Sequence, residues 1–203
     1  MKTKKNKSGI TLIELIVVVA IIAMMAAAVY VVRAPAEKKG SIELTQSTIE
    51  LLCAALEQYH SFYGKFPFDA DENYNKDDLE TDIGSTITIA GTDDYEPNYS
   101  SSEALYYFLD KVPDAKKIID SINGKSLTNK GKRGGKYSVI VNGTGYPLIR
   151  IVDAWGNALR YTCFYDTNKK RWDNFPLITS AGPDGNFGDT DSKYKKDNIT
   201  SRK

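Results

Sequence analysis

A single carboxylate stands inside the longest apolar run of the chain. From Ile10 to Val32 the only strongly polar side chain is Glu14. An acidic residue at the centre of a membrane helix costs about 2.5–3.5 kcal/mol on insertion scales, and less near the helix end, where it can reach water. A nearby positive charge would also explain the position of Glu14, because a pair of opposite charges is less costly to bury in lipid than either charge alone. The sequence therefore predicts an interfacial carboxylate or one that pairs with a cation.

A glycine and a basic leader precede this run. At 1.5 Å per residue the apolar run is roughly 35 Å of helix, enough to cross a bilayer core. A secretory signal peptide is cut after its apolar core, whereas a cut after Gly9 would remove only the leader and would create a positive amine at Ile10. We therefore expect the apolar helix to stay on the mature protein. The leader contains four lysines and no carboxylate: Lys2, Lys4, Lys5 and Lys7.

The order of these residues resembles the prepilin leader of type IV pilins and type II secretion pseudopilins. Gly9 and the stretch from Thr11 to Glu14 match the family's motif residue for residue, and Ile10 replaces the usual phenylalanine. The resemblance implies that a membrane prepilin peptidase cuts between Gly9 and Ile10 and methylates the new amine of Ile10. It also implies that Glu14 meets the amino terminus of a neighbouring subunit as a filament grows, which favours the paired carboxylate.

Closely spaced aspartates near the end of the chain are a second candidate site. Asp184, Asp189 and Asp191 stand on glycine-rich backbone, and Asp197 follows closely. Calcium takes six to eight oxygens, which aspartates and bent backbone carbonyls can supply. A solvated, turn-rich tail is the alternative. Resemblance to the calcium loop of major pseudopilins favours calcium, with Asp184 as the first ligand, the other three competing for the second position, and the carbonyl of Ala181 contributing.

Other reactive side chains suggest no enzyme. His60 is the only histidine, which excludes a histidine-rich metal site. Cys53 precedes it by seven positions, roughly 10 Å at helix rise, too far for a direct dyad. Cys53 and Cys163 could form a disulfide outside the cell. Both lie in apolar patterns, however, and we expect them to stay unpaired.

Charge sets the expected topology. The net charge of the chain is +1, and it falls to −3 without the four leader lysines, so no case for nucleic-acid binding remains. Basic residues stay cytoplasmic, which places the N-terminus inside and everything beyond Val32 outside. We expect a single-pass inner-membrane protein with a periplasmic C-terminal head, or a head on the cell exterior if there is one membrane.

A second helical pattern follows the apolar run. Ala34-Pro35 should kink or interrupt the helix, because proline lacks the N–H and disfavours helix in the residue before it. From residue 37 to 63 an apolar stripe then predicts a helix that packs on a sheet. Gly64 and Pro67 end it. The stripe consists of Ile42, Ile49, Leu52, Leu56, Tyr59 and Tyr63.

The rest of the chain predicts short elements. Residues 68–97 form a loop with one short helix. Ser101 or Ser102 caps a helix through Asp110, and Pro113 opens another that stops near Asn123. Residues 124–136 are a flexible basic loop. Antiparallel strands are expected at 137–141, 148–152, 159–165 and 174–179, with a hairpin turn at 166–169.

The stretch from Asp153 to Tyr161 resembles a second pseudopilin motif, in which Trp155 is a core anchor and Gly156-Asn157 a turn. Together these features predict an α+β, type IV pilin-like fold, with a long N-terminal helix packed on a small antiparallel sheet. The expected division is a leader at 1–9, a transmembrane or filament-core helix at 10–34, and a periplasmic head at 35–203 that ends in an acidic loop at 180–199.

The resemblance implies a structural subunit of the type II secretion pseudopilus. Such a subunit lies in membrane lipid before assembly, then associates with other pseudopilins into a helical filament on an inner-membrane assembly platform. Two alternatives stay open: a type IV pilus subunit for adhesion or motility, and a membrane-anchored periplasmic binding module that reuses a prepilin leader, with ligand contacts in the 68–99 loop or the acidic tail.

Overall fold

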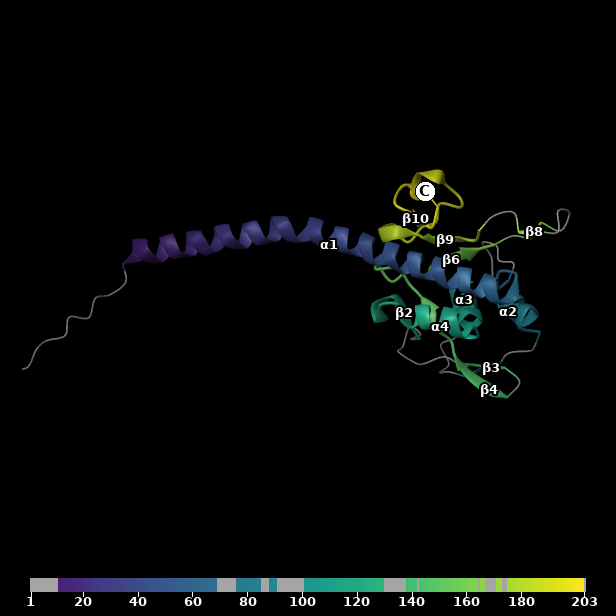
Figure 1. Ribbon diagram of the computed structural model, residues 1–203. Helices are drawn as coiled ribbons and strands as arrows, with labels where there is room; N and C mark the ends of the chain where they lie inside the picture. Colours follow the sequence, from purple (N-terminus) through teal and green to yellow (C-terminus); the bar gives the residue numbers. More distant parts are fainter. Residues whose placement is uncertain are drawn as a thin grey trace, which may run out of the picture. The chain divides into compact units, whose positions relative to one another are not determined.

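The computed structural model describes residues 11–68, 76–84, 88–90, 101–129, 138–141, 143–163, 165–166, 171–172 and 175–202. The chain divides into two compact units, residues 1–40 and 41–203. Much of the predicted loop at 68–97 and of the basic loop at 124–136 lies outside the described residues. The predicted class is confirmed, because a long N-terminal helix is joined to helices and small antiparallel sheets (Figure 1).

One helix, α1 (Leu12–Tyr63), contains both predicted helical segments. Of the two outcomes predicted at Ala34-Pro35, a kink or an interruption, the interruption is wrong, since the helix continues through both residues. Proline removes one backbone hydrogen bond, but helix propagation is cooperative, and the residues on either side keep theirs. The end of the helix is as predicted: Gly64 has φ +69° and its N–H donates to the carbonyl of His60 over 2.8 Å.

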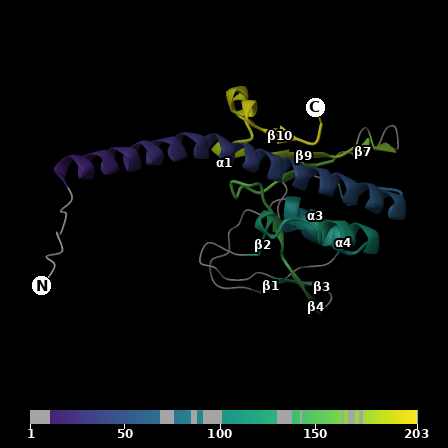
Figure 2. The same ribbon diagram turned by 60° about the vertical axis from the view of Figure 1, so that its left-hand side comes forward.

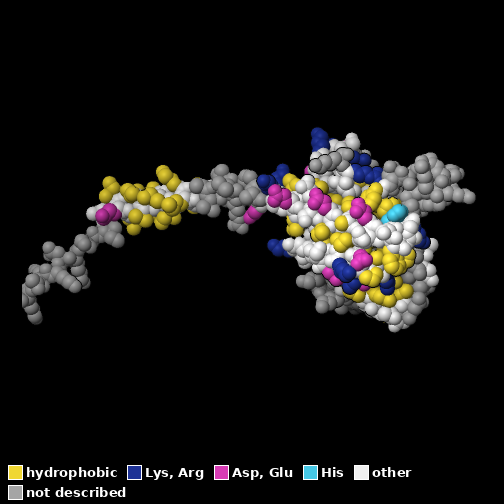
Figure 3. All heavy atoms as spheres, in the orientation of Figure 1, with side chains coloured by type: hydrophobic (Ala, Val, Ile, Leu, Met, Phe, Trp, Pro, Cys, Tyr) yellow, Lys and Arg dark blue, Asp and Glu magenta, His cyan; other side chains and the backbone are white. Residues whose placement is uncertain are grey.

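The first part of α1 exposes apolar side chains. Leu12 is 77% exposed and Met24 73%, and Figure 3 shows apolar side chains gathered on this segment. Among the residues that the structure describes, no helix is both long and apolar enough to cross a membrane. Other exposed large apolar residues of this segment are Ile13, Leu15, Ile16, Val17, Val18, Val19, Ile21, Ile22 and Met25.

The second part of α1 belongs to the core of the 41–203 unit. Four residues of the predicted stripe, Ile49, Leu52, Leu56 and Tyr59, are buried. Tyr63 is 47% exposed, because it is the last residue of the helix and lies beyond the core. In both ribbon views this part of α1 is drawn with strands β9 and β10 on one side and helices α3 and α4 on the other (Figures 1 and 2).

Two buried threonines continue the stripe, and the apolar pattern did not predict them. The hydroxyl of Thr45 accepts the N–H of Ala154 over 3.1 Å. The hydroxyl of Thr48 lies 3.0 Å from that of Ser126. Each threonine hydroxyl also donates to the carbonyl four residues earlier in α1, so its polar atoms are satisfied within the core.

Within the described residues, three further α-helices follow α1: α2 (Lys76–Ile83), α3 (Ser101–Asp110) and α4 (Pro113–Ile119), and α4 is followed by a 3-10 turn, η1 (Gly124–Ser126). The helix predicted to end at Asp110 is confirmed, whereas the helix opened by Pro113 ends four residues before Asn123. Ser101 was one of two residues predicted to cap this helix. Its hydroxyl instead accepts the N–H of Tyr161 over 2.8 Å. This bond joins α3 to the open edge of β6.

The strands are short and form several sheets rather than one. Among the described residues the sheet orders are β1-β3-β4, β10-β9-β6, β2-β5 and β7-β8. Every named pairing is antiparallel, as predicted. The strands are β1 (Thr88–Ala90), β2 (Leu127–Thr128), β3 (Ser138–Val141), β4 (Thr144–Pro147), β5 (Arg150–Ile151), β6 (Arg160–Thr162), β7 (Tyr165–Asp166), β8 (Arg171–Trp172), β9 (Leu177–Ser180) and β10 (Ile199–Thr200).

Hairpins connect neighbouring strands in this part of the chain. The predicted hairpin is confirmed by the pairing of Tyr165 with Trp172 and of Asp166 with Arg171, but Asp166 belongs to the strand and not to the turn predicted at 166–169. Residues 167–170 lie outside the described residues. Thr162 pairs with Leu177 further along the same two segments, and residues 164, 173 and 174 between the two pairings lie outside the described residues. The hairpin between β3 and β4 was missed, although Asn-Gly at 142–143 is a strong hairpin signal and Gly143 has φ +76°.

Candidate functional sites

The start of α1 is closed by a reciprocal cap between Thr11 and Glu14. One carboxylate oxygen of Glu14 accepts the backbone N–H of Thr11 over 2.8 Å and its hydroxyl over 2.9 Å. The N–H of Glu14 donates to the hydroxyl of Thr11 over 3.3 Å. This is a capping box, in which a threonine and the glutamate three residues later satisfy otherwise unpaired N–H groups of the first turn.

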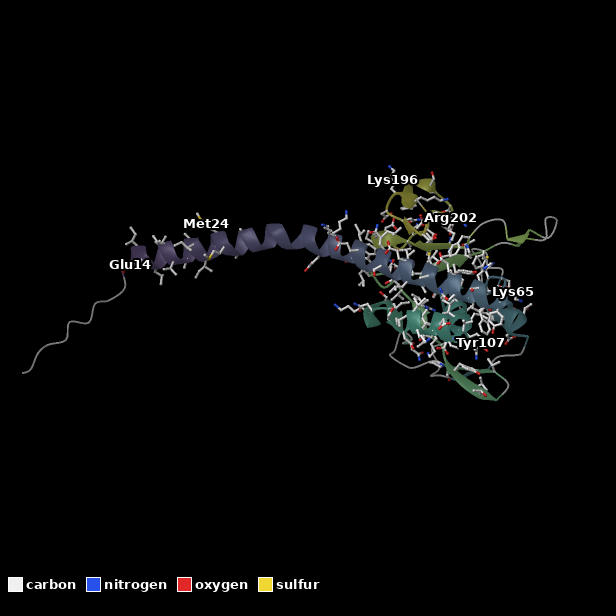
Figure 4. All side chains as sticks on the ribbon, viewed as in Figure 1. Glu14, Met24, Lys65, Tyr107, Lys196 and Arg202 are labelled. Atoms are coloured by element: carbon white, nitrogen blue, oxygen red, sulfur yellow. The ribbon has the colours of Figure 1, made fainter. Side chains whose placement is uncertain are left out.

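This geometry adds Thr11 to the N-terminal site. The sequence pattern Thr-x-x-Glu was sufficient to predict this capping box. Figure 4 shows Glu14 at the start of α1 and Met24 further along the same segment. Gly9 and Ile10, the predicted cleavage and methylation residues, lie outside the described residues. The helix begins at Leu12, so the predicted scissile bond precedes both the helix and its cap.

A buried aspartate organises the turn before β6. Asp153 is 1% exposed, and one of its carboxylate oxygens accepts the N–H groups of Trp155 and Asn157, each over 2.9 Å. The other oxygen accepts the hydroxyl of Ser180 over 2.8 Å. Trp155 itself is only half-buried. The predicted core anchor is therefore wrong: in this turn the buried group is the hydrogen-bonded carboxylate of Asp153.

The same turn is linked to the C-terminal loop. Gly156 has φ +91° and its N–H donates to the carbonyl of Asp153 over 3.1 Å, which confirms the predicted turn. The side-chain amide of Asn157 donates to the carbonyl of Gly182 over 2.7 Å. The hydroxyl of Ser180 accepts the N–H of Gly182 over 3.0 Å. Asn157 therefore joins the turn to the first residues of the loop.

The predicted calcium ligands have separate partners. Both carboxylate oxygens of Asp189 accept from the guanidinium of Arg160, over 2.9 and 2.8 Å. These bonds, followed by the charge of Arg160, lower the pKa of Asp189. Asp191 caps η3 (Ser192–Lys196) by accepting the N–H of Lys193 over 3.0 Å. It also pairs with the Lys193 ammonium over 2.8 Å, and these contacts lower the pKa of Asp191.

The other predicted ligands lie nearer the start of the loop. Asp184 ends η2 (Gly182–Asp184), and its carboxylate accepts the N–H of Asn186 over 2.8 Å. Ala181 is fully buried, and Asp197 lies against Gly182. Within the described ranges, no three His, Cys, Asp or Glu side chains are grouped to hold a metal ion. The predicted carboxylates are not assembled as one ligand set, and calcium binding stays a prediction.

Cys53 and Cys163 are not joined by a disulfide, in agreement with the expectation. Cys163 is 3% exposed. Burial raises the pKa of the Cys53 thiol, with a smaller opposing effect from a hydrogen bond with Ser201. A thiol with a raised pKa is a poor nucleophile at neutral pH, which agrees with a packing role for Cys53.

Comparison with known proteins identifies one segment. Residues 4–30 match the family described as the prokaryotic N-terminal methylation motif. The chain therefore carries a prepilin-type motif, the mark of pilin and pseudopilin proteins, which are structural subunits processed by a prepilin peptidase and assembled into filaments. No curated protein and no solved structure matches the chain.

Proposed function

We propose that this chain is a structural subunit of the periplasmic pseudopilus of a type II secretion system. The observation that carries the proposal is the prepilin-type motif at 4–30 followed by a helix whose apolar side chains are exposed. A contiguous apolar surface of this kind requires a partner surface or lipid. Copies of the same helix packed side by side would supply the partner, and the resemblance at 153–161 points to a pseudopilin rather than another pilin.

The same proposal includes the path to the filament. Residues 10–34 lie in the inner membrane before assembly, with the leader lysines in the cytoplasm and the head in the periplasm. The support is the apolar composition of this run and the position of the lysines. Prepilin peptidase removes residues 1–9, and an inner-membrane assembly platform then passes the mature chain to the growing filament with other pseudopilins.

Processing is the first test. Intact-mass analysis of the chain extracted from membranes should give a protein that begins at Ile10 and carries one methyl group. Gly9→Leu should block the cut, because the new side chain stands beside the scissile bond, while Ser8→Ala one residue earlier should leave it unchanged. A wild-type chain that retains Met1 in cells with a working prepilin peptidase would contradict the proposal.

A second test separates secretion from surface pili. Deleting the gene in its native host should leave exported proteins in the periplasm, and restoring the wild-type chain should release them. The Gly9→Leu variant should not restore release, and Ser8→Ala should. Normal export together with lost surface filaments would favour a type IV pilus subunit, and normal export with normal filaments would favour the binding module.

Calcium in the C-terminal loop is a separate proposal. It rests on the aspartate and glycine pattern of residues 180–199. Because Asp189 and Asp191 have cationic partners, the ligands left for calcium are Asp184, Asp197 and backbone carbonyls such as that of Ala181. Thermal unfolding of the full chain in detergent, with calcium and with a chelator, tests it. If calcium binds only the folded form, it raises the free energy of unfolding by about 2.7 kcal/mol when the free calcium concentration is a hundred times Kd.

A further inference from the structure

Arg160 lies where β6 meets the C-terminal loop. Successive side chains of a strand point to opposite faces. Tyr161 is buried in the core, 1% exposed, so Arg160 stands on the other face of β6. There it reaches a loop that leaves β9 at Ser180 and returns to the sheet at β10. The side chain of Arg160 is 20% exposed, low for a charged residue.

The guanidinium of Arg160 makes two kinds of contact with this loop. Its two terminal nitrogens donate to the two carboxylate oxygens of Asp189 over 2.9 and 2.8 Å. Its central carbon lies 3.8 Å from the centre of the Phe187 ring. Parallel bonds to a carboxylate and stacking on an aromatic face both use the planar fork of arginine, and lysine can reproduce neither geometry.

The loop backbone near Phe187 and Asp189 is tightly packed. Gly188, between the two contacting residues, has φ +70°, and a Cβ there would lie 2.6 Å from a side-chain carbon of Lys195. The side-chain amide of Asn198 donates to the carbonyl of Phe187 over 3.1 Å. Phe187 is thus contacted by Asn198 at its backbone carbonyl and by Arg160 at its ring.

We infer that Arg160, Phe187 and Asp189 form a clamp that fixes the acidic C-terminal loop to the sheet without a bound metal ion. The clamp places a protein cation where the sequence pattern alone suggested calcium. A carboxylate that shares both oxygens with a guanidinium is a poor further ligand, because the cation would repel the incoming ion. The lowered pKa of Asp189 agrees with this arrangement. The inference concerns loop order and does not depend on the proposed filament.

Trypsin provides a local test, because η3 carries Lys193, Lys195 and Lys196 within the loop (Figure 4 labels Lys196). The full chain in detergent is digested in excess EGTA, and mass spectrometry follows peptides that end at these lysines. Cleavage of a transiently opened segment follows its opening equilibrium. We expect Arg160→Met and Asp189→Asn each to accelerate cleavage about tenfold. The double variant should be no faster than either single one, because one interaction is lost in all three.

Controls keep the test specific. Lys117→Met breaks an exposed pair with Asp114 in α4 and should leave cleavage in η3 unchanged. Arg160→Lys keeps the charge but not the paired bonds, and should resemble Arg160→Met. Near-UV circular dichroism checks that the core of each variant is intact. If an Arg160 variant does not fold, Asp189→Asn on the exposed loop still tests the interaction.

Two results would overturn the inference. Cleavage rates of the Arg160→Met and Asp189→Asn variants equal to wild type would show that the backbone alone holds the loop. A wild-type loop that is cleaved about tenfold faster in EGTA than in excess calcium would show that the metal, and not Arg160, holds it. That second result would instead support the calcium proposal.

Discussion

Single polar residues inside the head act as connectors between segments that are distant in sequence. Asp153 joins the turn before β6 to β9 through Ser180. Asn157 extends this link to Gly182, and Arg160 continues it to Asp189. Three residues of one short stretch therefore position the whole C-terminal loop.

Removing the carboxylate of Asp153 should strongly destabilise the head. Asp153→Ala leaves the N–H groups of Trp155 and Asn157 without their acceptor in a buried site, and we expect a loss of about 3 kcal/mol or more. Asp153→Asn keeps one acceptor oxygen and should cost about 1–2 kcal/mol. Asp114→Ala, in an exposed pair, should stay within about 0.5 kcal/mol. Urea unfolding measures all three, and equal midpoints would contradict the role of Asp153.

At the N-terminus, two roles of Glu14 can be separated. Glutamine can replace glutamate in a capping box but carries no charge. If Glu14 pairs with the amine of a neighbouring subunit, Glu14→Gln and Glu14→Ala should both be cleaved normally and both fail to assemble, because the amine stays unpaired in a low-dielectric environment. Filament yield by electron microscopy is the measurement. Normal assembly of Glu14→Gln alone would assign the residue to capping, and normal assembly of both would make it interfacial.

Among the elements, α1 shows two environments along one helix. Its first part exposes apolar side chains, and its second part buries a stripe that ends with Tyr59. Tyr59 contacts the ring of Tyr63 at 4.8 Å between centroids. Burial, with a smaller effect of Tyr63, raises the pKa of Tyr59 to about 12. The neutral phenol is thus favoured in the folded state.

This shift predicts alkaline sensitivity of the helix packing. Because the folded pKa exceeds the unfolded value near 10, the contribution of Tyr59 is fully present below about pH 10 and is lost as pH rises toward 12. Tyr59→Phe removes the ionising group and keeps the ring, so the Tm should fall less between pH 9 and about 11.5 than in wild type. Phe62→Leu, at an exposed position of the same helix end, should keep the wild-type pH dependence. Identical curves for Tyr59→Phe and wild type would contradict the assignment.

For the whole molecule, the division at Gly40 implies that the head can fold alone. Among the residues that the structure describes, the buried hydrophobic core extends from Ile49 to Ala181, within the 41–203 unit. A fragment of residues 41–203 should therefore be soluble without detergent and unfold cooperatively. Its Tm should lie within about 3 °C of that of the head in the full chain, a difference below about 1 kcal/mol at this size. Aggregation of the fragment, or a non-cooperative transition, would show that the N-terminal segment is part of the folding unit.

The sequence alone was sufficient where the signal is local. The prepilin-type motif is a short ordered string, the stripe of α1 follows one helical period, and Gly64 and Gly156 mark backbone turns that glycine favours. The capping box of Thr11 and Glu14 could also be predicted from the sequence, because its two members are three residues apart. These features depend on neighbours along the chain, so composition and spacing determine them.

Tertiary structure decided what depends on partners far along the chain. Aspartates close in sequence suggested a metal site, but Arg160, twenty-nine residues before Asp189, pairs with one of them. The sequence pattern predicted Trp155 in the core, whereas the donors around Asp153 make that carboxylate the buried group. Spacing cannot reveal which cation or N–H group folding will bring to a carboxylate, and that choice determines whether the carboxylate is a ligand, a cap or a structural link.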